Sequence, residues 1–458
     1  MNDGNRHDGG GSWPKDAVSD QVTTPAPMPN TPTIASSDLT AVPVSIQPRA
    51  RITSIDCLRG LIVFTMIFVN DIAGVSPRIV PAWMRHFHGP NGMTFVDLVF
   101  PGFLFVVGMS IPFALGSRLN KGEPIWKTLA HVGVRTLSLL AIGILMVNET
   151  PSTEKMGWSG AGWCTLMYLS AILAFSSISP PRPADSTASR KQWGPNLSWA
   201  MRVAGLVALI YLALVFRGDN GQRIVSVAPF SIRTSWYGIL GLIGWAYLEA
   251  SLVFLLFRRQ RTALLGCGML LLGLYPAART GAFEGFWLGH YVGIGDTLGA
   301  LPSITVAGML LATILVTPDT ATVAARVRFA LLFMAGCAVG ALLLGGLYGI
   351  SKNNATPSWC LWACAVSAAL WLLFYWVSDV RPIGVIARPF AVAGENVLLA
   401  YLLSEMLPSA LDLLHLGGWY SRLAEPHLAC AVARSAGCAV VVLTVTAGLN
   451  RLGYRLKL

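Results

Sequence analysis

The sequence predicts an all-α fold, namely a polytopic transmembrane helical bundle with about 11–12 spanning helices. The chain of 458 residues is 54% hydrophobic and only 12% charged, whereas soluble domains carry roughly a quarter charged residues. Its mean hydropathy is +0.59. Runs of about 20 apolar residues recur along the chain, and each run is long enough to cross a bilayer as a helix.

About twelve segments have this apolar character. They are 56–75, 94–117, 126–147, 160–178, 198–216, 236–257, 262–278, 298–317, 328–350, 357–378, 388–407 and 428–449. Several contain Gly and Pro, which spanning helices tolerate where neighbouring groups satisfy the freed backbone.

Basic residues predict how these segments are oriented. Lys and Arg are about twice as frequent in alternate connections, starting with the one before residue 56, as in the others, and such an excess marks the cytoplasmic side. Arg258, Arg259 and Arg261 form one of these basic connections. We therefore expect an integral protein of the plasma (inner) membrane with both termini in the cytoplasm.

The first 50 residues differ from the rest of the chain. They are rich in Pro, Ser, Thr, Gly and Asn and contain no apolar run, which predicts a disordered cytoplasmic tail over 1–50 and a transmembrane domain over 51–458. The eight cysteines lack metal-type spacing, so no metal site is predicted. The net charge of +11 does not indicate nucleic-acid binding, because in a membrane protein the position of basic residues matters more than their sum. The predicted partner at this level is the lipid bilayer.

Titratable residues gather on the predicted outer side. His86 and His88 lie between two apolar segments, and His290, His415 and His427 fall on the same side. This distribution suggests a polar cavity that is open to that side. Loops carry polar residues for ordinary reasons too, so the distribution alone leaves both explanations open.

Asp97 opens the second apolar segment in a way that suits a carboxylate orienting a base. Thr94 can cap the helix, and Asp97 lies one turn in, near the positive end of the helix dipole. Pro101 cannot donate the hydrogen bond to the carbonyl of Asp97, so the helix should loosen there. A carboxylate beside a histidine is typical of an orienter–base pair.

Polar residues also lie at both ends of the first apolar segment. Asn70 and Asp71 close its outer end, where they either cap the helix or point into a cavity. Asp56 and Arg59 are three apart near the cytoplasmic end and share a helix face. They form either a simple ion pair or part of a site for an anionic cofactor.

A third polar group follows the ninth apolar segment. Lys352, Asn353 and Asn354 lie in a short connection on the predicted outer side. Their side chains suit a sugar or another polyol. A solvated turn explains the same residues equally well.

Seven motifs occur in order between about residues 51 and 410. They are SIDCLRG, FVND, NGMTFVDLVFPGFLFVVGMSI, SWYGILGLIGWAYL, GDTLGALPSITVAGMLLATIL, ISKNNATPSW and PFAVAGENVLLAYLLSE. Together they resemble a known family, the heparan-α-glucosaminide N-acetyltransferase-like membrane acyltransferases, which includes bacterial homologues associated with N-acetylglucosamine use. The block around TFVDLVFPGFLFVVG is the most specific of the seven.

The resemblance implies an enzyme that moves an acetyl group across the membrane. Acetyl-CoA binds from the cytoplasm, where Asp56 and Arg59 are the candidate binding residues. The acetyl group then reaches an amino sugar or glycan acceptor on the far side. The resemblance makes 51–458 an acyltransferase-like domain, and it also suggests a homodimer.

The resemblance assigns catalytic roles as well. His88 best matches the family's histidine just before N-G-x-T-x-x-D, with Asp97 orienting it and Asn70 steadying the oxyanion. His86 is a second candidate, because the His-to-Asp spacing is one residue shorter than in the family. Pro90 also replaces the tryptophan that usually precedes N-G.

Four residues are expected to bind the acceptor. Asn396 matches the asparagine of the family's late G-x-N motif. Lys352, Asn353 and Asp71 complete the set. The acceptor itself, and whether the histidine becomes acetylated or acts only as a base, stay open.

Two other functions fit the sequence. A transporter for an N-acetylglucosamine-related sugar would suit the many spans and Gly-rich helices, although no inverted repeat is obvious. A membrane O-acyltransferase acting on polysaccharide hydroxyls would share the D-x-x-R-G pattern at 56–60. Acetyl-CoA consumption by purified protein separates acyl transfer from transport, which needs a coupling ion instead.

Overall fold

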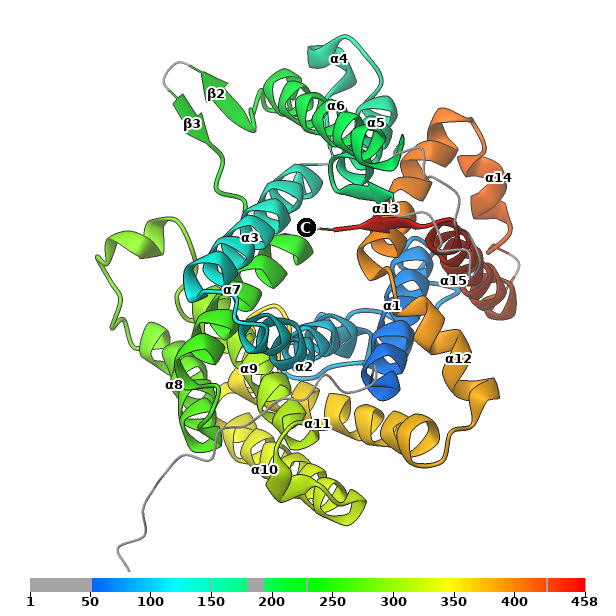
Figure 1. Ribbon diagram of the computed structural model, residues 1–458. Helices are drawn as coiled ribbons and strands as arrows, with labels where there is room; N and C mark the ends of the chain where they lie inside the picture. The colour runs from blue at the N-terminus through cyan, green and yellow to red at the C-terminus, as the bar shows by residue number, and fades with distance from the viewer. Residues whose placement is uncertain (1–51, 149, 179–192, 228–229, 426, 458) are drawn as a thin grey trace, which may run out of the picture. The chain divides into compact units, whose positions relative to one another are not determined.

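A computed structural model describes residues 52–148, 150–178, 193–227, 230–425 and 427–457 (Figure 1). All of them belong to one compact unit, Pro43–Leu458. The predicted disordered tail, 1–50, lies outside the described residues. The α-helices are α1 (Thr53–Ala73), α2 (Val99–Asn120), α3 (Ile125–Val147), α4 (Thr153–Met156), α5 (Gly160–Ala174), α6 (Trp193–Val215), α7 (Ile239–Phe257), α8 (Arg261–Arg279), α9 (Leu301–Ala312), α10 (Val323–Tyr348), α11 (Pro357–Phe374), α12 (Gly384–Ala393), α13 (Val397–Leu413), α14 (Gly417–Arg422) and α15 (Leu428–Arg451).

Shorter elements connect these helices. The 3-10 turns are η1 (Ala82–Met84), η2 (Phe95–Leu98), η3 (Trp287–His290), η5 (Thr313–Leu315) and η6 (Pro318–Thr320), and the π-helical turns are η4 (Asp296–Ala300) and η7 (Tyr375–Val380). The strands are β1 (Ser176–Ile178), β2 (Val225–Val227), β3 (Phe230–Ile232) and β4 (Tyr454–Leu456).

The predicted helical membrane fold is confirmed. Among the described residues, nine helices are long and apolar enough to cross a membrane, and the number becomes ten if the bent pair α12–α13 is one span. That range is lower than the predicted 11–12. Two expected segments account for the difference: α5 has only 15 residues, and α1 is a 21-residue helix that carries Asp56, Arg59 and Asp71.

Helix α1 lies among many partners. It contacts α2, α11, α12, α13 and α15, and Figure 1 shows it (blue) between α2 and the orange and red C-terminal helices. Most of its side chains are buried, including Leu58, Val63 and Ile67. A helix in this position can present polar groups at both of its ends to the interior of the bundle.

Helix α2 begins as the sequence predicts. The 3-10 turn η2 precedes the α-helix, and Pro101 follows as the third residue of α2. Proline lacks the N–H that would continue the α-helical ladder back toward Asp97. The looser turn therefore lies where that missing donor predicts it.

Glycines allow α2 and α9 to approach very closely. A Cβ on Gly108 would lie 1.8 Å from the carbonyl oxygen of Thr305, and one on Gly308 would lie 2.1 Å from that of Phe105. Small residues at such crossings let backbones touch, which is a main source of helix association in membranes.

The prediction of a continuous helix over 388–407 is wrong. The chain breaks at residues 394–396, and α12 and α13 meet there at a bend of 70°. The reason is packing against α1: a Cβ on Gly394 would lie 2.1 Å from the carbonyl oxygen of Asp56, and one on Gly60 would lie 1.9 Å from that of Phe390. Helix α12 therefore lies against the first turns of α1, and the chain must turn before α13 can begin.

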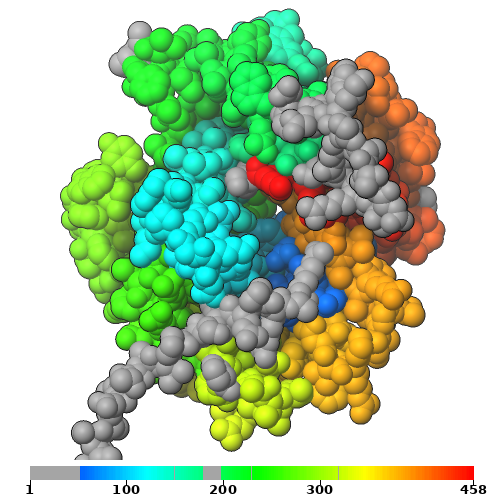
Figure 2. Space-filling model, viewed as in Figure 1, coloured from blue at the N-terminus to red at the C-terminus, as the bar shows by residue number. Residues whose placement is uncertain are grey.

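Two small antiparallel sheets were not predicted. Strand β1 pairs with β4, and β2 pairs with β3. The β1–β4 pair ties the end of the chain to the segment after α5, and the N–H of Lys457 adds a bond to the carbonyl of Phe175. In Figure 2 the red C-terminal strand is visible at the surface of this face.

Candidate functional site

The structure brings His86, Asp97 and Lys352 together in one polar cluster, which we call the outer cluster. Nδ1 of His86 lies 2.8 Å from Oδ1 of Asp97. The carboxylate of Asp97 is almost fully buried, with 1% of its side chain exposed, whereas 38% of the His86 side chain is exposed. A buried carboxylate on one ring nitrogen leaves the other nitrogen free to meet a substrate, which is the arrangement of an oriented base.

Local backbone bonds hold Asp97 in place. Its Oδ2 accepts bonds from the N–H groups of Phe87 and Thr94, at 3.1 and 3.0 Å. The hydroxyl of Thr94 donates to the carbonyl of Arg85 at 2.8 Å. Asp97 thus caps the start of its own helix and fixes the loop that carries His86. The sequence predicted Thr94 as the cap and Asp97 as the orienting group; in the structure Asp97 contacts His86 and also accepts from the N–H of Thr94, so both residues take part in the cap.

Lys352 reaches the outer cluster from the connection between α10 and α11. Its Nζ lies 3.1 Å from Nδ1 and 3.4 Å from Nε2 of His86, and 3.9 Å from Oδ1 of Asp97. Burial lowers the pKa of Lys352, while the charge of Asp97 opposes that shift. The connection is anchored, because the N–H of Gly92 donates to the carbonyl of Ile350 at 2.8 Å.

His88 and Asn353 lie outside this cluster. Both are exposed, and neither makes a hydrogen bond to a described residue of the chain. Asn354 bonds back to Ser351 in its own turn. The residue that contacts Asp97 is therefore His86, the second candidate of the sequence, rather than the first.

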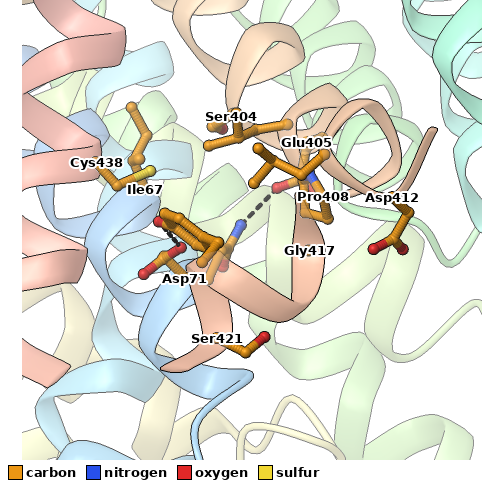
Figure 3. A pocket seen from close by; sticks show the side chains of 13 residues that line it. Ile67, Asp71, Ser404, Glu405, Pro408, Asp412, Gly417, Ser421 and Cys438 are labelled. Atoms are coloured by element: carbon orange, nitrogen blue, oxygen red, sulfur yellow. Dashed lines mark hydrogen bonds between the residues drawn. The ribbon is translucent and has the colours of Figure 1, made fainter. Parts of the chain in front are cut away.

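Asn70 lies in a separate cavity of about 190 Å³ at the outer end of α1 (Figure 3). Its Nδ2 donates to Oε1 of Glu405 at 2.6 Å. Asp412, Ser404 and Tyr420 also line this cavity. Glu405 and Asp412 come from one face of α13, seven residues apart, so the cavity combines an amide with two acidic side chains.

Asp71, also expected to bind substrate, is occupied by protein groups. Its carboxylate accepts from Arg434 at 2.9 Å, from the hydroxyl of Ser435 at 2.6 Å and from the hydroxyl of Tyr420 at 2.6 Å. The pKa of Tyr420 is raised by burial and by this bond to Asp71, so the phenol stays a neutral donor. Asp71 thereby fastens the outer end of α1 to α14 and α15.

Arg59, a candidate cofactor-binding residue, lies at a larger cavity of about 310 Å³ between α1, α2, α3, α7 and α13. Arg59 lines it and donates to Asp56 at 2.7 Å, to the hydroxyl of Ser110 at 2.7 Å and to the carbonyl of Gly394 at 3.2 Å. Arg135, from α3, lines the same cavity. The predicted Asp56–Arg59 ion pair is confirmed. The guanidinium groups of Arg59 and Arg135 form what we call the cationic wall of the cavity, and Glu395 adds one carboxylate to the lining.

Asn396 lines this larger cavity and belongs neither to the smaller cavity nor to the outer cluster. Its Nδ2 donates to the carbonyl of Tyr454 at 3.3 Å, and its Oδ1 accepts from the N–H of Leu456 at 3.4 Å. The asparagine that follows the break between α12 and α13 thus holds the C-terminal strand. This position separates it from Lys352, with which the sequence had grouped it.

The two cavities follow one another along the same pair of helices. On α1, Arg59 and Met66 line the larger cavity, and the next residue, Ile67, lines the smaller one. On α13 the lining passes from Tyr401 to Ser404 in the same way. Arg59 and Asn70 are separated by eleven residues of one helix, about 16 Å along its axis.

The smaller cavity and the outer cluster share one hydrophobic support. Ile72, two residues after Asn70, and Met84, two residues before His86, belong to one buried group that also contains Ala424 and Ala431. The loop that carries His86 is therefore packed on the same end of α1 that carries Asn70.

Several residues of these sites were not singled out from the sequence. Glu405, Arg434 and Tyr420 lie more than 330 residues from their α1 partners. Polar residues within apolar segments were the available hint, since they are costly in a membrane and are commonly paired or functional. Among the described residues, no group of three His, Cys, Asp or Glu side chains is placed to hold a metal ion.

Comparison with known proteins finds similarity over about a quarter of the chain. Residues 51–152 match the family model of a domain of unknown function, DUF5009. Human (Homo sapiens) heparan-alpha-glucosaminide N-acetyltransferase is 33% identical over 114 residues, which are 25% of this chain and 16% of the human protein. The mouse (Mus musculus) protein of the same name is 33% identical over 108 residues, 24% of this chain and 16% of its own length.

The predicted resemblance is therefore confirmed as a distant and partial similarity. The match spans only about a sixth of the length of these relatives. Arg59, Asn70, His86 and Asp97 all lie within residues 51–152, and Lys352 lies beyond them.

Proposed function

We propose that this protein is a membrane-embedded acetyltransferase. It moves the acetyl group of cytoplasmic acetyl-CoA to an amino sugar of the glucosamine type on the opposite side of the membrane. The observation that carries the proposal is the pair of cavities arranged end to end along α1 and α13, one with a cationic wall and one with acidic side chains. A donor and an acceptor held at opposite ends of one helix pair suit transfer across a bilayer.

The larger cavity suits the donor. Acetyl-CoA is polyanionic, and Arg59 and Arg135 supply guanidinium groups that bind phosphate oxygens well. The excess of basic residues in alternate connections supports a cytoplasmic location for this end. Much of the remaining lining is apolar, including Phe103, Val107 and Ile243, as a thioester arm would require.

The smaller cavity suits the acceptor. Glu405 and Asp412 can attract the ammonium group of an amino sugar. The amide of Asn70 supplies a donor that can turn from Glu405 to an oxyanion when substrate enters. Lys352 within the outer cluster, and Asn353 and Asn354 next to it in the chain, offer further polar groups.

His86 is the proposed base, in preference to His88, because it alone of the two contacts Asp97. Once the amine of the acceptor is neutral, its nitrogen attacks the thioester carbonyl, and the carbon–nitrogen bond forms as His86 takes the amine proton. The carbon–sulfur bond then breaks, and the thiolate of CoA leaves with that proton. Asp97 keeps the ring oriented and stabilises the imidazolium that exists between proton uptake from the amine and proton release to the thiolate.

The test is a transfer assay on purified, detergent-solubilised protein. Incubation with acetyl-labelled acetyl-CoA and a panel of amino sugars should give a labelled N-acetyl sugar and one equivalent of free CoA, with no ion gradient. A well-folded protein that neither binds CoA nor turns over the thioester would overturn the proposal. Label trapped on His86 without acceptor would indicate a covalent route.

One observation favours the transporter alternative. Helices broken near the membrane interior are typical of secondary transporters, and α12 and α13 form such a pair with a 70° bend. Uptake of an N-acetylated sugar into vesicles, driven by an ion gradient and indifferent to CoA, would establish transport. The acyltransferase proposal requires the opposite pattern.

A further inference from the structure

The outer cluster holds one charge more than an oriented base needs. A histidine and a carboxylate are sufficient for that role, yet the Nζ of Lys352 lies within 3.4 Å of both ring nitrogens of His86 and 3.9 Å from Asp97. Since the two ring nitrogens flank a single carbon, an atom this close to both lies against the ring rather than along one lone pair. The ammonium therefore acts on the whole imidazole as a neighbouring charge.

Hydrogen bonds between two loops fix the connection that carries Lys352. The N–H of Gly92 donates to the carbonyl of Ile350, and the N–H of Ile350 donates to Oδ1 of Asn91, both at 2.8 Å. The loop of the histidine and the connection of the lysine are thus bonded to each other in both directions. The N–H of Ser351 is in turn bonded to the hydroxyl of Thr356 at 3.0 Å.

The two charges act on His86 in opposite directions. A carboxylate beside a histidine favours the imidazolium form, by about 1 to 3 pH units for a neighbour within 4–6 Å. An imidazolium has no lone pair with which to take a proton, so Asp97 acting alone would lower the fraction of His86 that can accept a proton at a given pH. A cation at a similar distance favours the neutral form and offsets this effect.

We propose that Lys352 is a positioning residue that keeps the imidazole of His86 in its neutral, proton-accepting form by offsetting the charge of Asp97. The inference rests on the proposed role of His86 as the base. It assigns Lys352 to the catalytic histidine instead of to the sugar.

The other ionisable groups near His86 do not supply this charge. Among the described residues, the charged side chains in contact with His86 are Asp97 and Lys352. Arg85 and His88 precede and follow it in the same loop, and η1, which packs on η2, contributes Ala82, Trp83 and Met84. Burial lowers the pKa of Lys352, and the charge of Asp97 partly offsets that shift.

The experiment measures the protonation of His86 without any substrate. Diethyl pyrocarbonate modifies the neutral form of imidazole, and peptide mass spectrometry of the full-length, detergent-solubilised protein can resolve modification at His86 from that at His88. Modification rates from pH 5 to 9 are compared for wild type, Lys352→Met and Lys352→Arg. His88 is the internal control, because it is exposed and lies in the same loop.

In Lys352→Met, the pH at which His86 becomes half reactive should rise by about 1 to 3 units. In Lys352→Arg this pH should stay close to that of wild type. The pH at which His88 becomes half reactive should not change in either variant. The inference is overturned if the pH of half reactivity of His86 is unchanged in Lys352→Met, or if it shifts equally at His86 and His88. If Lys352→Met does not give a monodisperse protein, Lys352→Gln replaces it with the same expectations.

This measurement separates the inference from the proposed function. A shift at His86 in a protein that lacks acetyl transfer would uphold the electrostatic role of Lys352 while removing the acyltransferase proposal. If transfer is observed, the acid limb of the kcat/KM profile should move upward in Lys352→Met by the same interval. The high-pH plateau of kcat/KM should be retained, whereas a structural defect would lower it.

Discussion

The two ends of α1 are held by charged groups in opposite ways. At its N-terminal end, Asp56 and Arg59 pair within one helix, three residues apart. At its C-terminal end, Asp71 pairs with Arg434, which is 363 residues away, and both side chains are nearly buried. The first pair keeps a guanidinium facing a cavity, whereas the second closes a contact between helices. The difference lies in the ionic partner: Arg59 has a local carboxylate and still lines a cavity, although it also bonds to Ser110 and Gly394, whereas the distant Asp71–Arg434 pair joins two helices.

The largest expected effect separates chemistry from binding at the outer end. His86→Ala should lower kcat for acetyl transfer by about 10²- to 10⁴-fold, the usual contribution of a general base, and leave the KM for acetyl-CoA unchanged. His88→Ala is the matched control and should retain most of the activity. An inactive His88→Ala beside an active His86→Ala would return the assignment to His88.

The next effect tests whether Asp71 holds the fold. Asp71→Ala leaves Arg434 buried without its partner, and breaking such a pair costs about 3–5 kcal/mol. Thermal unfolding in detergent should show a clearly lower Tm. Asp412→Ala, which removes an exposed carboxylate from the same cavity, should leave the Tm close to wild type. Equal losses in both variants would contradict the structural role.

At the N-terminal end of α1, the expected effect is on binding instead. Arg59→Met should raise the KM for acetyl-CoA by about 10- to 100-fold, since a charge-assisted hydrogen bond contributes about 1.5–3 kcal/mol. The KM for the acceptor should not change. Arg118→Met is the control, because Arg118 pairs with Glu123 near the end of α2. A stability loss without a change in KM would place Arg59 with Asp71 as a purely structural residue.

The smallest expected effect compares two glycines of the α1 region. Gly60→Ala places a methyl group against the backbone of α12, and such overpacking costs about 1–3 kcal/mol. Gly74→Ala, just after the outer end of α1, meets only ordinary contacts and should be nearly neutral. Chemical denaturation of the two variants, measured side by side, checks this difference.

Sequence reasoning succeeded where the partners are near in the chain. The Asp56–Arg59 pair follows from helical spacing, and a cap of the second segment lies at Thr94, where the sequence predicted it, with Asp97 as its partner. Sequence reasoning did not predict the break at residues 394–396, because Gly394 and Gly60 owe their roles to a backbone crossing that no local pattern encodes. It placed His88 before His86, and motif spacing alone cannot tell which ring meets the carboxylate.

What the sequence determined by itself is the membrane character of the chain, the approximate position of its helices and the residue types of each polar group. These depend on hydropathy and on helical periodicity, which act over a few turns. Only the tertiary structure decided that His86 contacts Asp97, that Lys352 joins them and that Asn70 meets Glu405. Those pairings depend on how distant helices pack, and packing is set by close contact over the whole bundle.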